Sequence, residues 1–186
     1  MPEKYQIVKK EELTPDIVRV SVYAPLVAKK AKPGQFIILR TDERAERIPL
    51  TISSCGEDGS VSVVVQKVGD STLTLGEMNE GDCLRDFVGP LGVPTEIESS
   101  GKVAVIGGGL GCAIALPVAK AMHDAGCDVD LIGGFRSKSF VILENEMWCR
   151  KTSVFLSRET GMPGNFVGRI KGAKCPFDLQ FLTWDF

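Results

Sequence analysis

Residues 103–126 read VAVIGGGLGCAIALPVAKAMHDAG, and the order of their apolar and glycine residues indicates the fold of the second half of the chain. The apolar residues 103–106 predict a buried strand. Residues 107–111 are a loop with four glycines, and residues 112–126 predict a helix that ends at Gly126, because glycine commonly follows the last helical turn. A strand, a glycine loop and a helix in this order indicate an α/β module.

Two further strands extend this module toward the C-terminus. They are DVDLIGGF at 128–135 and TSVFLS at 152–157. Residues 137–151 between them are a helix candidate, although the segment FVIL makes its beginning less typical of a helix. Strands that alternate with helices predict a parallel sheet with crossover helices. We place the boundary between this module and the preceding part of the chain near Ser100.

The first hundred residues contain strands without intervening long helices. Six short segments rich in β-branched residues lie at 4–13, 17–25, 34–42, 47–55, 60–68 and 82–90. Turn residues separate several of them, and one short helix is expected at 71–78, with Ser71 or Thr72 as its N-cap. This pattern predicts an antiparallel barrel or sandwich.

The composition is that of an ordinary globular protein of 186 residues, with 44% hydrophobic and 25% charged residues. A formal net charge of -2 argues against a nucleic-acid partner. No apolar run approaches the roughly 18 residues of a transmembrane helix, and the N-terminus lacks an apolar signal core, so we expect a cytoplasmic protein without a membrane partner.

The six cysteines are widely spaced and form no CxxC pair; they are Cys55, Cys83, Cys112, Cys127, Cys149 and Cys175. Zinc and iron–sulfur sites normally use closely spaced pairs. We therefore expect no metal site and interpret the cysteines as small apolar residues in a reducing compartment, with disulfides as the alternative.

The glycine loop at 105–111 (VIGGGLG) has the chemistry of a phosphate cradle. Glycines let the backbone approach a pyrophosphate, and a helix N-terminus offers free N–H groups. A standard dinucleotide-binding unit would place an acidic residue after the second strand, whereas this chain has Arg136, Ser137 and Lys138 there. This favours a different nicotinamide-binding module. The basic pair either receives a 2′-phosphate or forms a solvated helix start.

The segment RIPLTI at 47–52 contains an arginine and a proline on what otherwise looks like a buried strand. Arginine is rarely buried without a partner, and proline removes a ladder donor. A flat, anionic ligand next to this strand accounts for both residues.

Five segments together resemble the flavin-bearing small subunit of NADH-dependent ferredoxin:NADP oxidoreductases, also known as a sulfide dehydrogenase subunit, in the ferredoxin–NADP reductase superfamily. The segments are RIPLTI (47–52), VVVQKVGDST (63–72), FVGPLG (87–92), VIGGGLGCAIALPVAKA (105–121) and GGFRSKSFVILENEM (133–147). The resemblance covers residues 3–155. The electron-transfer subunit of dihydroorotate dehydrogenase is a close relative of this family.

The resemblance implies that residues 1–99 form a six-stranded antiparallel Greek-key β-barrel that binds FAD. Arg47 would pair with the FAD pyrophosphate, Pro49 and Leu50 would shape the strand beside the isoalloxazine, and Thr51 would hydrogen-bond near the reactive N5 atom. The second flavin-binding segment would contribute Val65, Gln66, Lys67, Gly69, Ser71 and Thr72.

The resemblance further implies that residues 100–158 form a NAD(P)-binding α/β module that takes NAD(H) or NADP(H); the choice between these two stays open. The phosphates would lie on the loop formed by Gly107, Gly108, Gly109, Leu110 and Gly111. Gly133, Gly134 and Arg136 would border the adenosine half. FAD would then carry electrons between NAD(P)H and a partner, which needs no general acid or base.

The expected partner is a larger flavoprotein or iron–sulfur subunit in a hetero-oligomer, with ferredoxin as a further candidate. Family members are longer and carry a C-terminal cysteine cluster for a [2Fe–2S] centre. Here Cys175 stands alone, so no such centre is expected. We interpret the α/β module as incomplete and residues 159–186 as a divergent, loosely packed tail. A truncation or a frameshift would produce such a tail.

Two alternatives to this function remain. The chain could be the electron-transfer subunit of dihydroorotate dehydrogenase, or a truncated flavin-binding remnant without turnover.

Overall fold

The structure is a computed structural model that describes residues 2–147 and 152–156. The chain divides into two compact units, Met1–Glu96 and Ile97–Phe186, and each is described by itself. The expectations for residues 159–186 fall outside the described residues.

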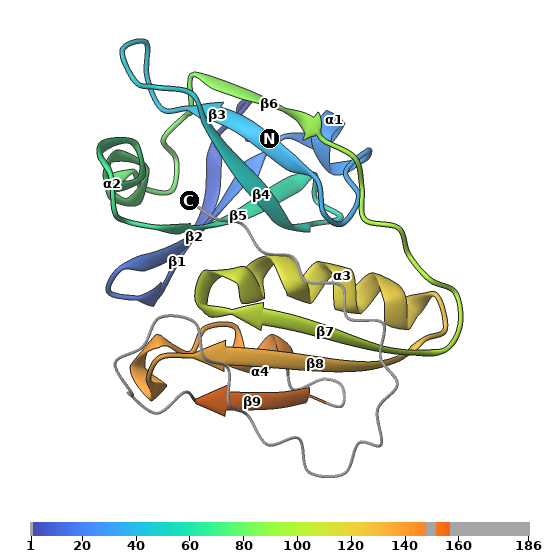
Figure 1. The fold of residues 1–186 in the computed structure, drawn as a ribbon. Coiled ribbons are helices and arrows are strands. Elements are labelled where there is room, and N and C mark those ends of the chain that lie inside the picture. Colours follow the sequence, from blue (N-terminus) through green and yellow to red (C-terminus); the bar gives the residue numbers. More distant parts are fainter. Residues whose placement is uncertain (1, 148–151, 157–186) are drawn as a thin grey trace. The chain divides into compact units, whose positions relative to one another are not determined.

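The first unit is built on a six-stranded antiparallel sheet with the order β1-β2-β5-β4-β3-β6 (Figure 1). Its strands are β1 (Ile7–Thr14), β2 (Ile17–Tyr23), β3 (Phe36–Arg40), β4 (Ile48–Cys55), β5 (Ser60–Gln66) and β6 (Asp86–Leu91). The N–H of Ile7 donates to the carbonyl of Asp82, at 2.8 Å, and the N–H of Gly81 donates to the carbonyl of Ile7, at 2.9 Å. These bonds join β1 to the segment before β6 and close the sheet, so the predicted antiparallel barrel is confirmed.

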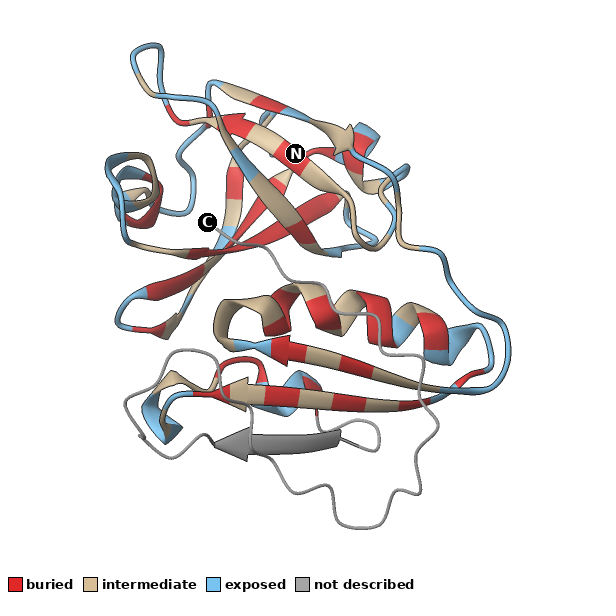
Figure 2. Cartoon of the chain, in the orientation of Figure 1, coloured by how far each residue is buried: buried red, intermediate tan, exposed pale blue. Residues whose placement is uncertain are grey.

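The barrel core consists of the inward-facing residues of these strands. Val18, Val20 and Val22 alternate along β2 and are fully buried, and Phe87 on β6 is 2% exposed. Figure 2 shows buried and half-buried residues alternating as red and tan bands along β3, whereas β5 is buried along most of its length. Because side chains alternate between the two faces of a strand, the odd-numbered residue Arg19 faces away from this core.

Two helices lie in the first unit, α1 (Pro25–Ala28) and α2 (Asp70–Glu77). The predicted N-cap of α2 is wrong, because Gly69 occupies that position rather than Ser71 or Thr72. Thr72 still caps the helix, but from its third residue: its hydroxyl oxygen accepts the N–H of Gly69 at 2.9 Å. Thr72 therefore does cap α2, as its residue type indicates, but the N-cap position itself lies three residues earlier, at Gly69.

The second unit contains a parallel sheet with the order β7-β8-β9, as the alternation of strands and helices predicts (Figure 1). Its strands are β7 (Lys102–Gly108), β8 (Asp128–Phe135) and β9 (Thr152–Leu156). After β7 the chain forms the short 3-10 helix η1 (Gly109–Gly111) and then α3 (Cys112–Asp124), which packs on β7 and β8. Gly126 has a φ of 108° and ends α3, as expected.

The single helix considered for residues 137–151 is not formed. Two short helices replace it in the described part, η2 (Lys138–Phe140) and α4 (Glu144–Met147), and residues 148–151 lie outside the described residues. Between these helices Val141 is extended and Leu143 has a φ of 59°. Ile142 and Leu143 are buried. Burying this apolar segment therefore interrupts the helix.

The four described cysteines are free: Cys112 and Cys127 are buried, whereas Cys55 and Cys83 are exposed. Cys149 and Cys175 lie outside the described side chains. Among the described residues, no three His, Cys, Asp or Glu side chains are placed to hold a metal ion. None of the helices in the described segments has the length and apolar character needed to cross a membrane.

Candidate functional site

The strand that carries RIPLTI changes its partner in mid-course. Residues Ile48 to Thr51 of β4 pair with β3, whereas the ladder with β5 begins only at Ile52, opposite Val63. Beyond Val63, β5 continues alongside β2 as far as Gln66. The first half of β4 and the second half of β5 therefore have no ladder with each other.

Because of this divergence, the main-chain groups of residues 48–51 that face the β5 side of β4 have no partner strand there. The N–H of Ile52 donates to the carbonyl of Gln35 on the β3 side, at 3.0 Å. N–H groups of successive residues in a strand point to opposite sides, so the N–H of Thr51 points to the β5 side. Pro49 lies on the same side as Thr51, and its missing N–H removes one donor there.

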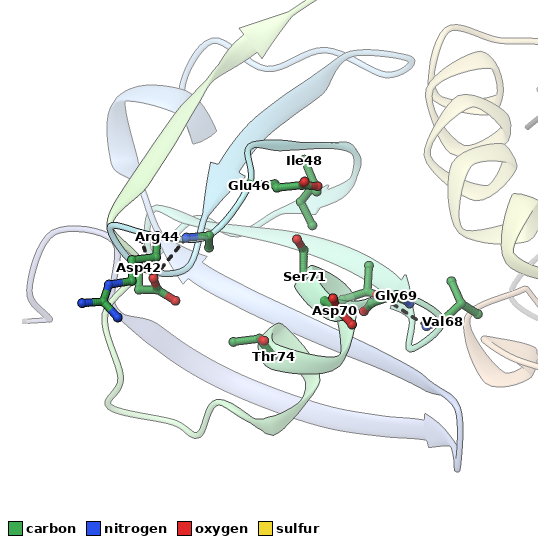
Figure 3. Close-up of a pocket in the computed structure, with 11 residues that line it drawn as sticks. Asp42, Arg44, Glu46, Ile48, Val68, Gly69, Asp70, Ser71 and Thr74 are labelled. Atoms are coloured by element: carbon green, nitrogen blue, oxygen red, sulfur yellow. Dashed lines mark hydrogen bonds between the residues drawn. The ribbon is translucent and has the colours of Figure 1, made fainter.

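A cavity of about 560 Å³ lies between the loop that precedes β4 and the first turns of α2 (Figure 3). Its lining residues are Asp42, Arg44, Ala45, Glu46, Ile48, Val68, Gly69, Asp70, Ser71, Thr72 and Thr74. Ser71 points from α2 toward Glu46 and Ile48 on the opposite wall (Figure 3). This volume is typical of a small-molecule site.

The loop wall of this cavity is folded by an aspartate turn. One oxygen of Asp42 accepts the N–H groups of Arg44, at 2.7 Å, and Ala45, at 3.1 Å. These hydrogen bonds, that from Arg44 foremost, hold the pKa of Asp42 below its usual value. Sequence patterns alone do not predict this wall, because DERAE at 42–46 has the composition of a solvated charged loop. The signal for it is an aspartate two residues before a turn.

The N-terminus of α2 forms the opposite wall and has a positive dipole end. The hydroxyl oxygen of Thr72 accepts the N–H groups of Val68, at 3.1 Å, and Gly69, at 2.9 Å. The N–H groups of the following residues belong to the first turn, whose donors have no partner within the helix. Gly69 and Ser71 line the cavity, so this helix end is placed to receive an anion.

The side chains around the cavity do not themselves provide a matching positive charge. Glu46 and Asp70 line it and are acidic, and the guanidinium group of Arg44 points outward, away from α2 (Figure 3). The lining side chains therefore add no positive charge to that of the N-terminus of α2.

Arg47 does not line this cavity, although its neighbours Glu46 and Ile48 do. Its Nη2 atom lies 3.1 Å from Oδ2 of Asp86, and the same oxygen lies 2.8 Å from Nε of Arg40. The Arg47 side chain is 60% exposed. Arg47 thus forms an ion pair at the protein surface, with part of its guanidinium group facing solvent.

Three of the other residues predicted from the barrel motifs line the cavity, and the rest do not. Gly69, Ser71 and Thr72 line it, whereas Pro49 is exposed and Leu50, Thr51, Gln66 and Lys67 are half-buried on or after β4 and β5. The side chain of Val65 is 1% exposed and belongs to the barrel core, so only its main chain can face a ligand. The alkyl chain of Lys67 lies against Gly76 of α2, where a Cβ would come within 2.6 Å of its Cδ.

The glycine loop after β7 contains two kinds of glycine. A Cβ on Gly107 would lie 2.8 Å from the Cα of Cys112, so this glycine lets α3 pack closely on β7. Gly108, Gly109 and Gly111 have no heavy atom within 4 Å of the Cβ position, and Gly109 has a φ of 51°. The open side of the loop fits a ligand that approaches the main chain, with Leu110 half-buried between these glycines.

The predicted residues at the end of β8 and directly after it also differ in their surroundings. A Cβ on Gly133 would lie 2.7 Å from the terminal methyl of Met147, so Gly133 makes room for α4, while Gly134 is half-buried. Arg136 is exposed and lies over the ring of Phe140, 4.6 Å from its centre. The hydroxyl groups of Ser137 and Ser139 are 2.8 Å apart. Arg136 is therefore held over the ring of Phe140.

Cys112 follows the glycine loop directly, but its chemistry is that of a packing residue. It is buried, and burial raises the pKa of its thiol to about 12 while the N–H of Gly134 acts in the opposite direction. The thiol therefore stays neutral near physiological pH and is no nucleophile.

A closed antiparallel barrel followed by a separate unit of parallel strands with a glycine loop is the arrangement of the ferredoxin–NADP reductase fold. This chain matches the structure of an NADH-dependent reduced ferredoxin-NADP oxidoreductase, which was described in connection with flavin-based electron bifurcation. The TM-score is 0.79 and the sequence identity is 37%, over 84% of this chain and 57% of that one. Phthalate dioxygenase reductase shares the fold, with a TM-score of 0.65 and 16% identity over 85% of this chain and 52% of that one.

Sequence relatives identify the family within this fold. An uncharacterised protein from the adh 3′ region of Clostridium beijerinckii is 44% identical over 84% of this chain and 56% of its own length. The homologue of the dihydroorotate dehydrogenase B (NAD(+)) electron transfer subunit from Thermotoga maritima is 42% identical over 76% of this chain and 50% of its length. The corresponding subunit from Streptococcus pneumoniae is 30% identical over 96% of this chain and 71% of its length.

The chain belongs to the family of dihydroorotate dehydrogenase B electron transfer subunits and their homologues. It spans about half the length of the first two of these relatives. The match to the pneumococcal subunit covers 96% of the chain and so continues past residue 155, where the resemblance stated from the sequence motifs ends. No known protein-family profile matches the chain.

Proposed function

We propose that this chain is an electron-transfer flavoprotein subunit that binds FAD in its barrel and passes electrons between NAD(P)H and a partner. The observation that carries the proposal is the divergence of β4 from β5 next to the N-terminus of α2. A flat ring system with hydrogen-bonding edges fits beside the diverging strands, and a diphosphate fits the helix end. FAD joins these two groups in one molecule.

The flavin site is supported by what its residues offer. Thr51 is half-buried and presents its N–H one residue before Ile52, where the β4–β5 ladder begins. Gly69, Ser71 and Thr72 line the cavity at the start of α2. In this proposal Thr51 faces the reacting part of the flavin, α2 faces the diphosphate, and Arg47 supplies the positive charge that the cavity walls lack.

The dinucleotide site is proposed on the open side of the glycine loop after β7. Gly108, Gly109 and Gly111 have room for phosphate oxygens close to their main-chain N–H groups. Arg136 lies at the end of β8, where the adenosine half of a dinucleotide would be expected.

When both are bound, the flavin and the nicotinamide supply the redox chemistry, and the chain contributes binding and alignment. No described side chain needs to move a proton in this proposal. The thiol of Cys112, which lies next to the loop, stays protonated because burial raises its pKa to about 12.

The partner is proposed to be a larger flavoprotein or iron–sulfur subunit, with ferredoxin as a further candidate. The proposal of a larger partner subunit rests on the relatives, which are named as electron transfer subunits. The same names favour a second function, electron transfer in a dihydroorotate dehydrogenase. The two differ in the protein that co-purifies with the chain: a dihydroorotate dehydrogenase catalytic subunit supports the second function, and a larger iron–sulfur flavoprotein the first.

An anaerobic titration tests the proposed function. The protein is loaded with FAD, desalted, and mixed with NADH or with NADPH while the visible flavin absorption is followed. We expect the flavin band to bleach with one of the two nucleotides. A yellow protein that does not bleach indicates a flavin-binding chain without turnover, and a colourless protein contradicts the flavin assignment itself.

A further inference from the structure

Three charged residues stand in a row across three neighbouring strands at one end of the barrel. Arg40 on β3 lies opposite Asp86 on β6. Leu39 lies opposite Ile48, which places Arg47, the residue before β4, next to Arg40 on the other side of β3. The order across the sheet is therefore Arg47, Arg40, Asp86.

The Arg47 side chain spans this row. Strands in a sheet are roughly 4.8 Å apart, so Asp86 is two strands, or about 10 Å, away from the main chain of Arg47. The Nη2 atom of Arg47 nevertheless reaches to 3.1 Å from Oδ2 of Asp86. The side chain must therefore extend across β3, toward β6.

The candidate flavin cavity lies on the other side of β4. Its walls are the loop before β4 and the helix α2, which follows β5, and β5 and β3 flank β4 on opposite sides. The guanidinium group that the cavity lacks is thus held on the far side of its own strand. The carboxylate of Asp86, which binds this guanidinium group, also lies 2.8 Å from Nε of Arg40. Asp86 therefore remains paired when Arg47 leaves it.

We propose that Asp86 is the resting counter-ion of Arg47 and competes with the diphosphate of the flavin nucleotide for this guanidinium. Without ligand, Asp86 holds Arg47 across β3. When the diphosphate binds at the N-terminus of α2, Arg47 exchanges the carboxylate for phosphate oxygens, and Arg40 alone neutralises Asp86. The inference rests on the proposed function, because it takes FAD as the ligand of the cavity.

Because Asp86 and the diphosphate compete for Arg47, removing the charge of Asp86 should raise the affinity for FAD. An exposed ion pair contributes little, and Arg47 is 60% exposed, so breaking the pair opposes binding only weakly. Asp86→Asn keeps the shape of the side chain and removes its charge. This substitution should tighten FAD binding by about two- to fivefold, which corresponds to the usual strength of such a pair.

The experiment is a double-mutant cycle on FAD-free protein. FAD affinity is measured by quenching of flavin fluorescence for the wild type, Asp86→Asn, Arg47→Ala and the double variant. We expect Asp86→Asn to tighten binding in the wild type and to have no effect in the Arg47→Ala background. Glu43→Gln is the matched control, because Glu43 pairs with Arg85, at 3.3 Å, and not with Arg47; it should leave the affinity unchanged.

Three outcomes overturn the inference. Weaker binding by Asp86→Asn means that Asp86 orients Arg47 for the ligand, equal tightening with and without Arg47 means a general charge effect, and no effect of Asp86→Asn means that Asp86 does not compete with FAD. Each of these results leaves FAD binding by the wild type intact. Failure of the wild type to bind FAD overturns the proposed function instead, together with this inference.

A measurement on the wild type covers the case in which a variant does not fold. The side-chain N–H signal of Arg47 in a ¹⁵N spectrum, assigned with Arg47→Ala or Arg47→Lys, should shift when FAD saturates the protein. A signal that stays in place at saturation shows that Arg47 keeps its contact with Asp86 and contradicts the exchange.

Discussion

At the residue scale, Arg47 illustrates what a sequence can and cannot reveal. An arginine on an apolar strand indicates a need for a negative partner, and the structure contains one in Asp86, 39 residues further along the chain. Nothing in the local sequence marks Asp86, since the pairing depends on the register of three strands. The cavity loop at 42–46 was missed for a related reason, because its charges look solvated until the aspartate turn is seen.

Replacing Arg47 should weaken the flavin complex if this residue meets the diphosphate. Arg47→Ala removes a charge-assisted hydrogen bond, generally about 1.5–3 kcal/mol, so FAD affinity should fall by roughly ten- to a hundredfold. Arg47→Lys keeps the charge but loses the two-pronged geometry and should lie in between. Calorimetric titration with FAD measures both.

Arg85→Ala serves as the control for Arg47→Ala, because Arg85 is an arginine of the same barrel end that pairs with Glu43 and does not line the cavity. It should leave FAD affinity unchanged. Equal affinities of the wild type and Arg47→Ala for FAD would refute the assigned role of Arg47.

The thiol of Cys112 should resist alkylation in the folded protein. Burial raises its pKa to about 12, so the fraction of reactive thiolate is negligible at mildly alkaline pH. The exposed Cys83 is accessible to the reagent and provides an internal comparison. Mass spectrometry after treatment with iodoacetamide should find Cys83 modified and Cys112 unmodified, with both modified after unfolding. Rapid modification of Cys112 in the native protein would contradict its place in the core.

At the element scale, the glycine loop separates a packing role from a binding role. Gly107 and Gly108 are neighbours, yet an added Cβ meets the Cα of Cys112 at 2.8 Å in the first case and nothing within 4 Å in the second. Gly107→Ala should therefore destabilise the second unit by about 1–3 kcal/mol, as overpacking does. Gly108→Ala should leave the melting temperature unchanged, and thermal unfolding compares the two.

The same pair of variants also tests the dinucleotide site. Gly108→Ala places a methyl group where phosphate oxygens would approach, so it should weaken NADH or NADPH binding without loss of stability. An unchanged affinity in Gly108→Ala would remove this glycine from the proposed site and leave the packing role of Gly107 untouched.

Periodicity and turn residues were sufficient to predict the barrel strands, the parallel strands and α3, because each has a clear apolar pattern with glycine or turn residues at its ends. They were insufficient where tertiary burial decides the local structure. Residues 137–151 have helix-forming segments, but burial of Ile142 and Leu143 breaks them into η2 and α4. The N-cap of α2 is Gly69 rather than Ser71 or Thr72, and the hydroxyl oxygen of Thr72 accepts the N–H of Gly69 from within the helix.

At the scale of the whole chain, the two units carry separate halves of the proposed function. The described side chains that line the cavity all belong to the first unit, and the glycine loop belongs to the second. The fold and the family follow from both units together, since the barrel motifs and the glycine loop match the same relatives. The pairing of Arg47 with Asp86 lies within the first unit and can be studied there.

The absorbance spectrum of the protein after incubation with FAD and desalting decides whether the barrel binds a flavin. The barrel, with its diverging β4 and β5 and the cavity at α2, should retain one flavin per chain and give a yellow protein. A colourless protein that is folded by circular dichroism, after the same treatment, would contradict the account.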